Sequence, residues 1–179
     1  DGDQDLVVFG RQVPGKYSMT PESYLLINEN GKFTNKTLEL APDLQFAGMI
    51  TEGVFTDLDN DLDDDLIVVG EWMRPRFFEN QNGKLISNDT YLQDPNLYGW
   101  WNTIQPYDIN NDGKYEYLLG NTGLNNKFHP SSLFPLTAYL EDVDQNGKAD
   151  LILSKYFGGI QHPVRGRGCL SEQIPSVKE

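Results

Sequence analysis

The sequence has few of the features that would indicate a disulfide-stabilised, membrane-spanning or nucleic-acid-binding protein. Cys169 is the single cysteine, so no disulfide can form within the chain. The cysteine count therefore does not indicate whether the protein works in an oxidising or a reducing compartment. Lys and Arg number 14 against 27 Asp and Glu, and the net charge of −13 disfavours nucleic acid and anionic membranes as partners. No apolar run of about 18 residues predicts a transmembrane helix, and no signal-peptide pattern is present.

Catalytic motifs are also missing. The sequence has no HExxH, GxSxG or P-loop pattern, and its two histidines, His129 and His162, are isolated. Trp72, Trp100 and Trp101 offer rings for stacking on a sugar, but packing is the favoured interpretation. We therefore expect a chain that is not itself an enzyme.

One acidic stretch dominates what is present. Six aspartates fall within residues 57–65 and are followed directly by the apolar run 66–69. Neighbouring carboxylates about 4 Å apart repel by roughly 1 kcal/mol per pair even in water. A solvated acidic face is one interpretation. A bound divalent cation is the other, and calcium is favoured because it takes six to eight oxygen ligands, whereas magnesium demands a tight octahedron.

The same spacing recurs along the chain. DINNDGKYE begins at Asp108 and DVDQNGKAD begins at Asp142, with oxygen-bearing side chains again at positions one, three, five and nine. Gly113 and Gly147 stand at position six, where a positive φ would let the loop curl around an ion. Leu62 stands there in the first complete loop, which predicts a strained or differently shaped turn.

The predicted metal ligands occupy alternate positions of each complete loop. At position seven the ligand is expected to be the backbone carbonyl, because an ammonium group cannot bind a cation. The candidate residues are Asp57, Asp59, Asp61, Asp63, Asp65, Asp108, Asn110, Asp112, Lys114, Glu116, Asp142, Asp144, Asn146, Lys148 and Asp150. Asp1, Asp3 and Asp5 match the last part of a further loop, so we expect this sequence to be a piece of a longer chain.

The segments around these loops indicate strands and exclude an EF-hand. Position twelve of each loop is apolar (Val68, Leu119, Leu153) where an EF-hand needs glutamate, and short apolar runs flank each loop. A cytosolic sensor is disfavoured because such proteins respond through a pair of helices. The expected strands are 5–10, 24–28, 32–34, 49–56, 65–72, 75–79, 84–86, 100–107, 115–120, 136–140 and 149–155, with hairpin turns at Asn30-Gly31 and Asn82-Gly83.

DLDNDLDDDLIVVGEW, YGWWNTIQPYDINNDGKYEYLLGNTGLN and YLEDVDQNGKADLIL together resemble FG-GAP/VCBS-type repeats, in particular the VCBS branch found in secreted or surface-anchored bacterial proteins. These repeats are similar to those of integrin α-subunit β-propellers. The resemblance implies calcium loops between the first two strands of each blade, and an extracellular, cell-surface or periplasmic location. Leu62 and Glu116 depart from the family pattern.

The expected fold is all-β, a partial propeller of three to four repeats at about 1–40, 41–92, 93–130 and 131–155. Residues 156–179 form a tail outside the repeats, for which a linker, a loop of a further blade or a short helix capped by Ser171 remain open. Open sheet edges would favour self-association. The expected role is calcium-stabilised adhesion, scaffolding or binding of a protein or carbohydrate ligand. The alternative is part of a secreted polysaccharide-acting enzyme whose catalytic residues lie elsewhere.

Overall fold

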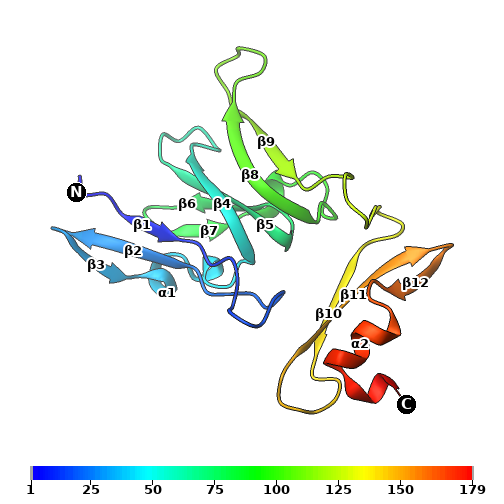
Figure 1. Ribbon diagram of the computed structural model, residues 1–179. Coiled ribbons are helices and arrows are strands. Elements are labelled where there is room, and N and C mark those ends of the chain that lie inside the picture. The colour runs from blue at the N-terminus through cyan, green and yellow to red at the C-terminus, as the bar shows by residue number, and fades with distance from the viewer. Residues whose placement is uncertain (1, 179) are drawn as a thin grey trace. The chain divides into compact units, whose positions relative to one another are not determined.

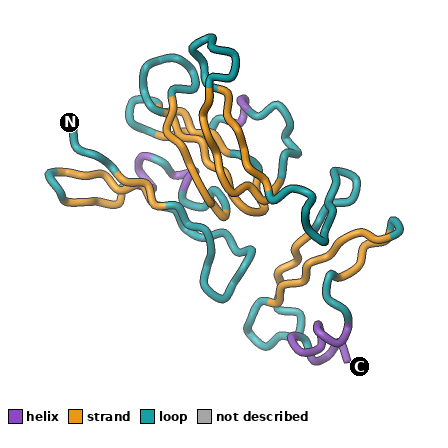
Figure 2. The backbone as a smooth tube through the Cα atoms, turned by 45° about the horizontal axis from the view of Figure 1, so that its top comes forward, coloured by secondary structure: helices purple, strands orange, loops and turns teal. Residues whose placement is uncertain are grey.

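A computed structural model describes residues 2–178, which fold mostly into antiparallel β-sheets with a few short helices (Figures 1 and 2). The chain forms two compact units. Unit 1 comprises the residues up to Val13 together with Thr20–Thr122, and unit 2 comprises Pro14–Met19 with the residues from Gly123 onward. None of the helices within residues 2–178 is long and apolar enough to cross a membrane.

The first sheet of unit 1 has the order β1-β2-β3 (Figure 1). Its strands are β1 (Leu6–Val8), β2 (Tyr24–Glu29) and β3 (Lys32–Asn35), and two short helices follow, α1 (Thr37–Leu40) and η1 (Pro42–Leu44). The β2–β3 hairpin turns at Asn30 and Gly31, whose φ angles are 54° and 83°. Two successive positive φ values suit the tight turn that Asn-Gly predicts.

The second sheet of unit 1 contains an antiparallel meander formed by β4 (Met49–Thr56), β5 (Asp65–Met73), β6 (Arg76–Asn80) and β7 (Leu85–Ser87). The short helix η2 (Asp89–Tyr91) follows it. The strands expected from the sequence at 49–56, 65–72, 75–79 and 84–86 are confirmed to within one residue at each end.

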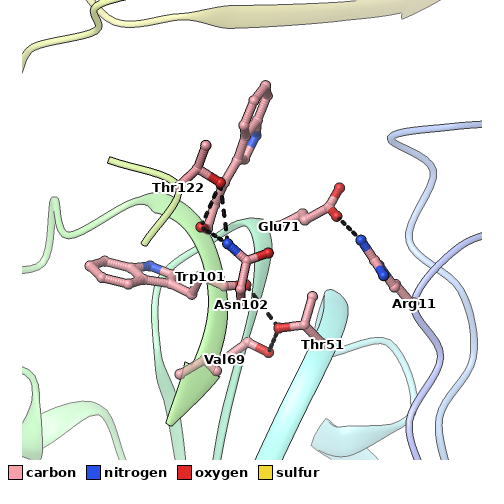
Figure 3. Close-up of polar contacts among 8 residues, drawn as sticks. Arg11, Thr51, Val69, Glu71, Trp101, Asn102 and Thr122 are labelled. Carbon is pink, nitrogen blue, oxygen red and sulfur yellow. Dashed lines mark hydrogen bonds and ion pairs between the residues drawn. The ribbon is translucent and has the colours of Figure 1, made fainter. Parts of the chain in front are cut away.

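Strands β8 (Gly99–Tyr107) and β9 (Glu116–Asn121) complete this sheet in the order β7-β6-β5-β8-β9, with β4 also paired to β5. The hydroxyl group of Thr51 on β4 links β5 and β8 of this sheet. Thr51 Oγ1 lies 2.8 Å from the carbonyl oxygen of Trp101 and 3.1 Å from that of Val69 (Figure 3). Nearby, Arg11 pairs with Glu71 at 2.6 Å (Figure 3). The bonds of Thr51 join β4 to β5 and β8, and the Arg11–Glu71 pair joins the segment after β1 to β5.

Two apolar cores meet at β5. Leu66 and Val68 belong to the first core with Leu25 and Phe78, and Ile67 and Val69 belong to the second. The second core also contains Trp101 and Ile104. All four β5 side chains are at most 1% exposed. The apolar run after the acidic loop is therefore a strand buried on both faces, as continuous hydrophobic runs predict.

Unit 2 holds a three-stranded sheet in the order β10-β11-β12. Its strands are β10 (Thr137–Glu141), β11 (Asp150–Phe157) and β12 (Ile160–Pro163), followed by α2 (Arg167–Gln173) and η3 (Pro175–Lys178). Gly166 is the N-cap of α2, so Ser171 lies inside the helix, where its hydroxyl donates to Gly168 O at 2.8 Å. A helix capped by Ser171 is thus wrong, and β12 is a strand that the sequence did not predict.

The prediction of a mostly β fold with antiparallel strands is confirmed, whereas a propeller is not detected among residues 2–178. The described strands form three separate sheets of three, six and three strands. The meander β4–β7 is the one complete four-stranded unit among them.

Candidate metal centres in the interstrand loops

Three acidic loops connect neighbouring antiparallel strands in the same register. We call them the Asp57 loop (57–65), the Asp108 loop (108–116) and the Asp142 loop (142–150). The residue before each loop pairs with the loop's ninth residue, in the pairs Thr56–Asp65, Tyr107–Glu116 and Glu141–Asp150. Figures 1 and 2 show the first two loops at one end of the unit 1 sheet. Flanking strands, not helices, hold all three, which confirms the exclusion of an EF-hand.

All three loops share one hydrogen-bond pattern. The N–H of residue five donates to the side chains of residues one and three, the N–H of residue six donates to residue one, and the N–H of residue seven donates to residue five. These bonds span 3.0–3.2 Å in the Asp57 loop, 2.9–3.1 Å in the Asp108 loop and 2.8–3.2 Å in the Asp142 loop. The backbone thus curls around the alternating side-chain oxygens, as the spacing predicted.

The curl requires two left-handed residues in each loop. Residue six has φ of 74° at Leu62, 84° at Gly113 and 85° at Gly147. Residue four is left-handed as well, at Asn60, Asn111 and Gln145, and the sequence did not reveal this second turn. Leu62 therefore adopts the glycine conformation rather than a different turn. A leucine there is strained, because its Cβ crowds the following carbonyl oxygen.

Two loops bring three carboxylates together. Asp57, Asp59 and Asp61 offer oxygen atoms within 4.8 Å of one another, and Asp142, Asp144 and Asp150 do the same. In the described part of the Asp108 loop no three carboxylates gather in this way. There position three is Asn110, whose Nδ2 donates to Asp112 Oδ2 at 3.0 Å. Either carboxylate group could hold a metal ion.

The Asp57 loop carries uncompensated negative charge. Within residues 2–178 none of its carboxylates forms an ion pair. Desolvation and the nearby Asp61 raise the pKa of both Asp59 and Asp63 above the ordinary value. Asp63 Oδ1 is buried and has no hydrogen-bond partner in the described residues. An orphaned anionic oxygen beside other carboxylates is a fit for a cation, because burying an uncompensated charge is costly.

The ninth residue has a structural role of its own. Asp65 is 1% exposed, and its two oxygens accept the N–H groups of Leu58 and Asn80, both at 2.7 Å. Asp150 likewise accepts from Val143 N at 3.2 Å and Gln173 Nε2 at 3.1 Å. Each buried carboxylate therefore ties its loop to an element outside the hairpin.

An asparagine motif that the sequence reasoning missed makes the same connection in two repeats. Asn80 donates its N–H to Asp65 and its side-chain amide to Asp64 O, and Asn28 makes the matching bonds to Asp5 and Gln4 O. Both asparagines begin an Asn-x-Asn-Gly sequence. The repeated Asn-x-Asn-Gly was the available signal. It supports Asp5 as a ninth position, while Asp1 lies outside the described residues.

The position-seven residues Lys114 and Lys148 occupy matching places in their loops. Lys114 N and Lys148 N donate to the fifth side chain at 2.9 Å in their loops, and a metal-binding role for their carbonyls stays a prediction.

Among the aromatic residues, Trp101 is 8% exposed in the second core, and Trp72 meets Trp100 edge-to-face at 5.0 Å. Packing is therefore the observed role of Trp101.

Comparison with known proteins identifies part of the chain. Residues 57–119 match the family described as the FG-GAP-like repeat, a span from the first residue of the Asp57 loop into β9. The chain matches none of the curated proteins and none of the solved structures compared with it. The match contains two complete acidic loops of shared geometry, and it bears out the FG-GAP resemblance over these residues. Residues 57–119 of this chain are an FG-GAP-like repeat.

Proposed function

We propose that this chain is a calcium-binding repeat module without catalytic activity, serving adhesion, ligand binding or scaffolding in an extracellular or cell-surface protein. The observation that carries the proposal is the repeated loop geometry. Three loops with one hydrogen-bond pattern converge side-chain oxygens at the same end of a strand pair. Two of them gather three carboxylates each.

Calcium fits these loops better than magnesium. Side chains at positions one, three, five and nine and a carbonyl at position seven would supply an all-oxygen shell from a flexible loop, which calcium accepts and the rigid magnesium octahedron does not. The Asp57 and Asp142 loops, with clustered carboxylates, would bind more tightly than the Asp108 loop. The Asp108 and Asp142 loops each carry three carboxylates, but in the Asp108 loop Nδ2 of Asn110 already occupies an oxygen of Asp112.

We further propose that the repeats stack as blades of a propeller. The β4–β7 meander has the four antiparallel strands of a blade, and both faces of β5 are covered by apolar cores. An extracellular setting is consistent with this role, because extracellular calcium modules work at about 10⁻⁴–10⁻³ M. Calcium would then be a structural ion that fixes each inner hairpin.

Thermal unfolding of the 179-residue chain tests the proposal. We expect millimolar calcium to raise the melting temperature, chelator to reverse the rise, and magnesium at equal concentration to have a smaller effect. Asp59→Ala and Asp144→Ala each remove one member of a carboxylate group and should reduce the calcium effect. Asp43→Ala, an exposed aspartate outside the loops, is the matched control. A melting temperature indifferent to calcium and chelator would refute the proposal.

A further inference from the structure

Strand β9 has an open edge where its counterparts in other repeats are paired. The strand after the acidic loop pairs with a third strand in the repeats of β5 (with β6) and β11 (with β12), and β1 pairs with β2. Within residues 2–178, β9 pairs with β8 alone. Its register places Tyr117 opposite Pro106 and Leu119 opposite Ile104.

The backbone groups of Tyr117 and Leu119 face away from β8. Proline has no N–H, and the N–H of Ile104 donates instead to Glu52 Oε2 at 2.9 Å. Antiparallel pairs alternate between hydrogen-bonded and non-hydrogen-bonded positions. Both residues therefore stand at non-hydrogen-bonded positions with respect to β8, which leaves their N–H and C=O groups at the outer edge.

The ninth-position carboxylate of this repeat also has a free oxygen. Asp65 and Asp150 each accept one bond within the loop and a second from an outer element. Glu116 Oε2 accepts from Ile109 N at 2.9 Å, but in the described residues Glu116 Oε1 accepts nothing. In the β5 repeat the second donor is a backbone N–H, that of Asn80, two residues beyond Phe78 on the third strand.

An apolar groove lies beside the same edge. It has a volume of about 450 Å³, and its lining includes Phe77, Tyr91, Leu97, Tyr117 and Leu119. Asp94 also lines it, and no Lys or Arg does. Tyr117 follows the ninth position of its loop, as Leu66 does in the β5 repeat. Leu66 pairs with Phe78, whose 0% exposed ring fills the first core. The groove is thus the place that a third strand's Phe78 equivalent would fill.

We propose that β9 binds an extended strand of a partner protein in antiparallel orientation. The strand would place a large apolar side chain opposite Tyr117, in the groove, and donate the N–H two residues later to Glu116. It would be basic, because the chain has a net charge of −13 and the only charged side chain that lines the groove is the acidic Asp94. Such strand addition combines main-chain hydrogen bonds with a specificity pocket.

The chain's own downstream segment is already engaged elsewhere. In unit 2 the carbonyl of Lys127 accepts from Lys155 Nζ at 2.9 Å, and Phe134 packs against Tyr156 at 5.2 Å. These contacts commit the segment after β9 to β11. Within the described residues, the segment after β9 is therefore not the occupant, and the proposed strand belongs to another molecule.

A synthetic peptide with the sequence of residues 74–88 provides the probe, because it contains β6 and has three basic residues against one acidic residue. The labelled peptide is titrated into the 179-residue chain with calcium present, and binding is followed by fluorescence anisotropy. We expect saturable binding, weakened roughly tenfold or more when the peptide carries Phe78→Ala, because the apolar contact in the groove is lost. Leu97→Glu in the protein should weaken binding similarly, whereas Leu38→Glu, at a side chain 72% exposed outside the groove, should not.

Hydrogen exchange locates the bound strand. Protection of residues 116–121 on peptide binding supports the proposal. Protection of β5 would instead show that the peptide replaces the chain's own β6, and would overturn it. No saturable binding, equal binding of the Phe78→Ala peptide, or a calcium-loaded dimer with β9 protected before peptide is added would also overturn it. Because the peptide readout is separate from calcium-dependent melting, the two proposals can fail independently.

Discussion

Leu62→Gly should stabilise the Asp57 loop. Leu62 has a φ of 74°, and its side chain is 92% exposed, so a glycine relieves strain and gives up almost no packing. The left-handed conformation costs a leucine about 1–2 kcal/mol. Glycine also increases the conformational entropy of the unfolded chain, which lowers the stabilisation by about 0.4–1 kcal/mol. The expected gain is roughly 0.5–1 kcal/mol, or a melting temperature higher by about 1–4 °C.

The mirror exchange in the neighbouring loop is the matched control. Gly113 has the same position and a φ of 84°, and a Cβ there meets nothing within 4 Å. Gly113→Leu should therefore lower the melting temperature of unit 1 by a similar amount, through backbone strain alone. Circular dichroism melts of both variants, with chelator and with calcium, measure the effect. If Leu62→Gly leaves the melting temperature unchanged or lowers it while Gly113→Leu is destabilising, the strain argument is refuted.

Three further predictions concern the carboxylates of the Asp57 loop. Asp63→Asn should raise the melting temperature in chelator, because the oxygen without a hydrogen-bond partner no longer belongs to an anion. The same substitution should reduce the further rise that calcium gives, and an unchanged calcium effect would contradict this prediction. Asp65→Ala leaves the N–H groups of Leu58 and Asn80 without their acceptor. At roughly 1–3 kcal/mol per unsatisfied group, the substitution should cost about 2–6 kcal/mol in urea unfolding with or without calcium, and a loss of less than about 1 kcal/mol would contradict it. The raised pKa values of Asp59 and Asp63 mean that these carboxylates bind protons more tightly in the folded chain than in the unfolded chain. Their destabilising effect at neutral pH should therefore be relieved as the pH falls through the raised pKa values towards about 3.9. Melts in chelator and in calcium should show the calcium effect on the melting temperature shrinking over the same pH range.

Local patterns in the sequence were enough to predict most strands and all three loops. Apolar runs such as 66–69 and Asn-Gly turns act over a few residues, and the structure places β5 and both hairpins accordingly. The curled loops follow from the alternating oxygens for the same reason, since the bonds that form them span at most five residues.

Features that depend on distant contacts were not accessible in this way. The bond from Asn80 to Asp65 joins residues 15 apart, and β12 is specified by pairing with β11 rather than by its own weakly apolar sequence. That β9 pairs with β8 alone within residues 2–178 can be seen only once the strand pairs are known. Leu62 shows the opposite case, in which the loop's hydrogen bonds override the residue's own preference.

The shared use of β5 by two cores restricts how such an array can be shortened or spliced. Removing the β8–β9 hairpin would strip the cover from Ile67 and Val69, while removing the β1–β3 sheet would uncover Leu66 and Val68. A graft from another protein would therefore have to match the side chains that its new neighbour presents, such as Trp101 and Ile104. Protein engineers should exchange these repeats in adjacent pairs rather than one at a time.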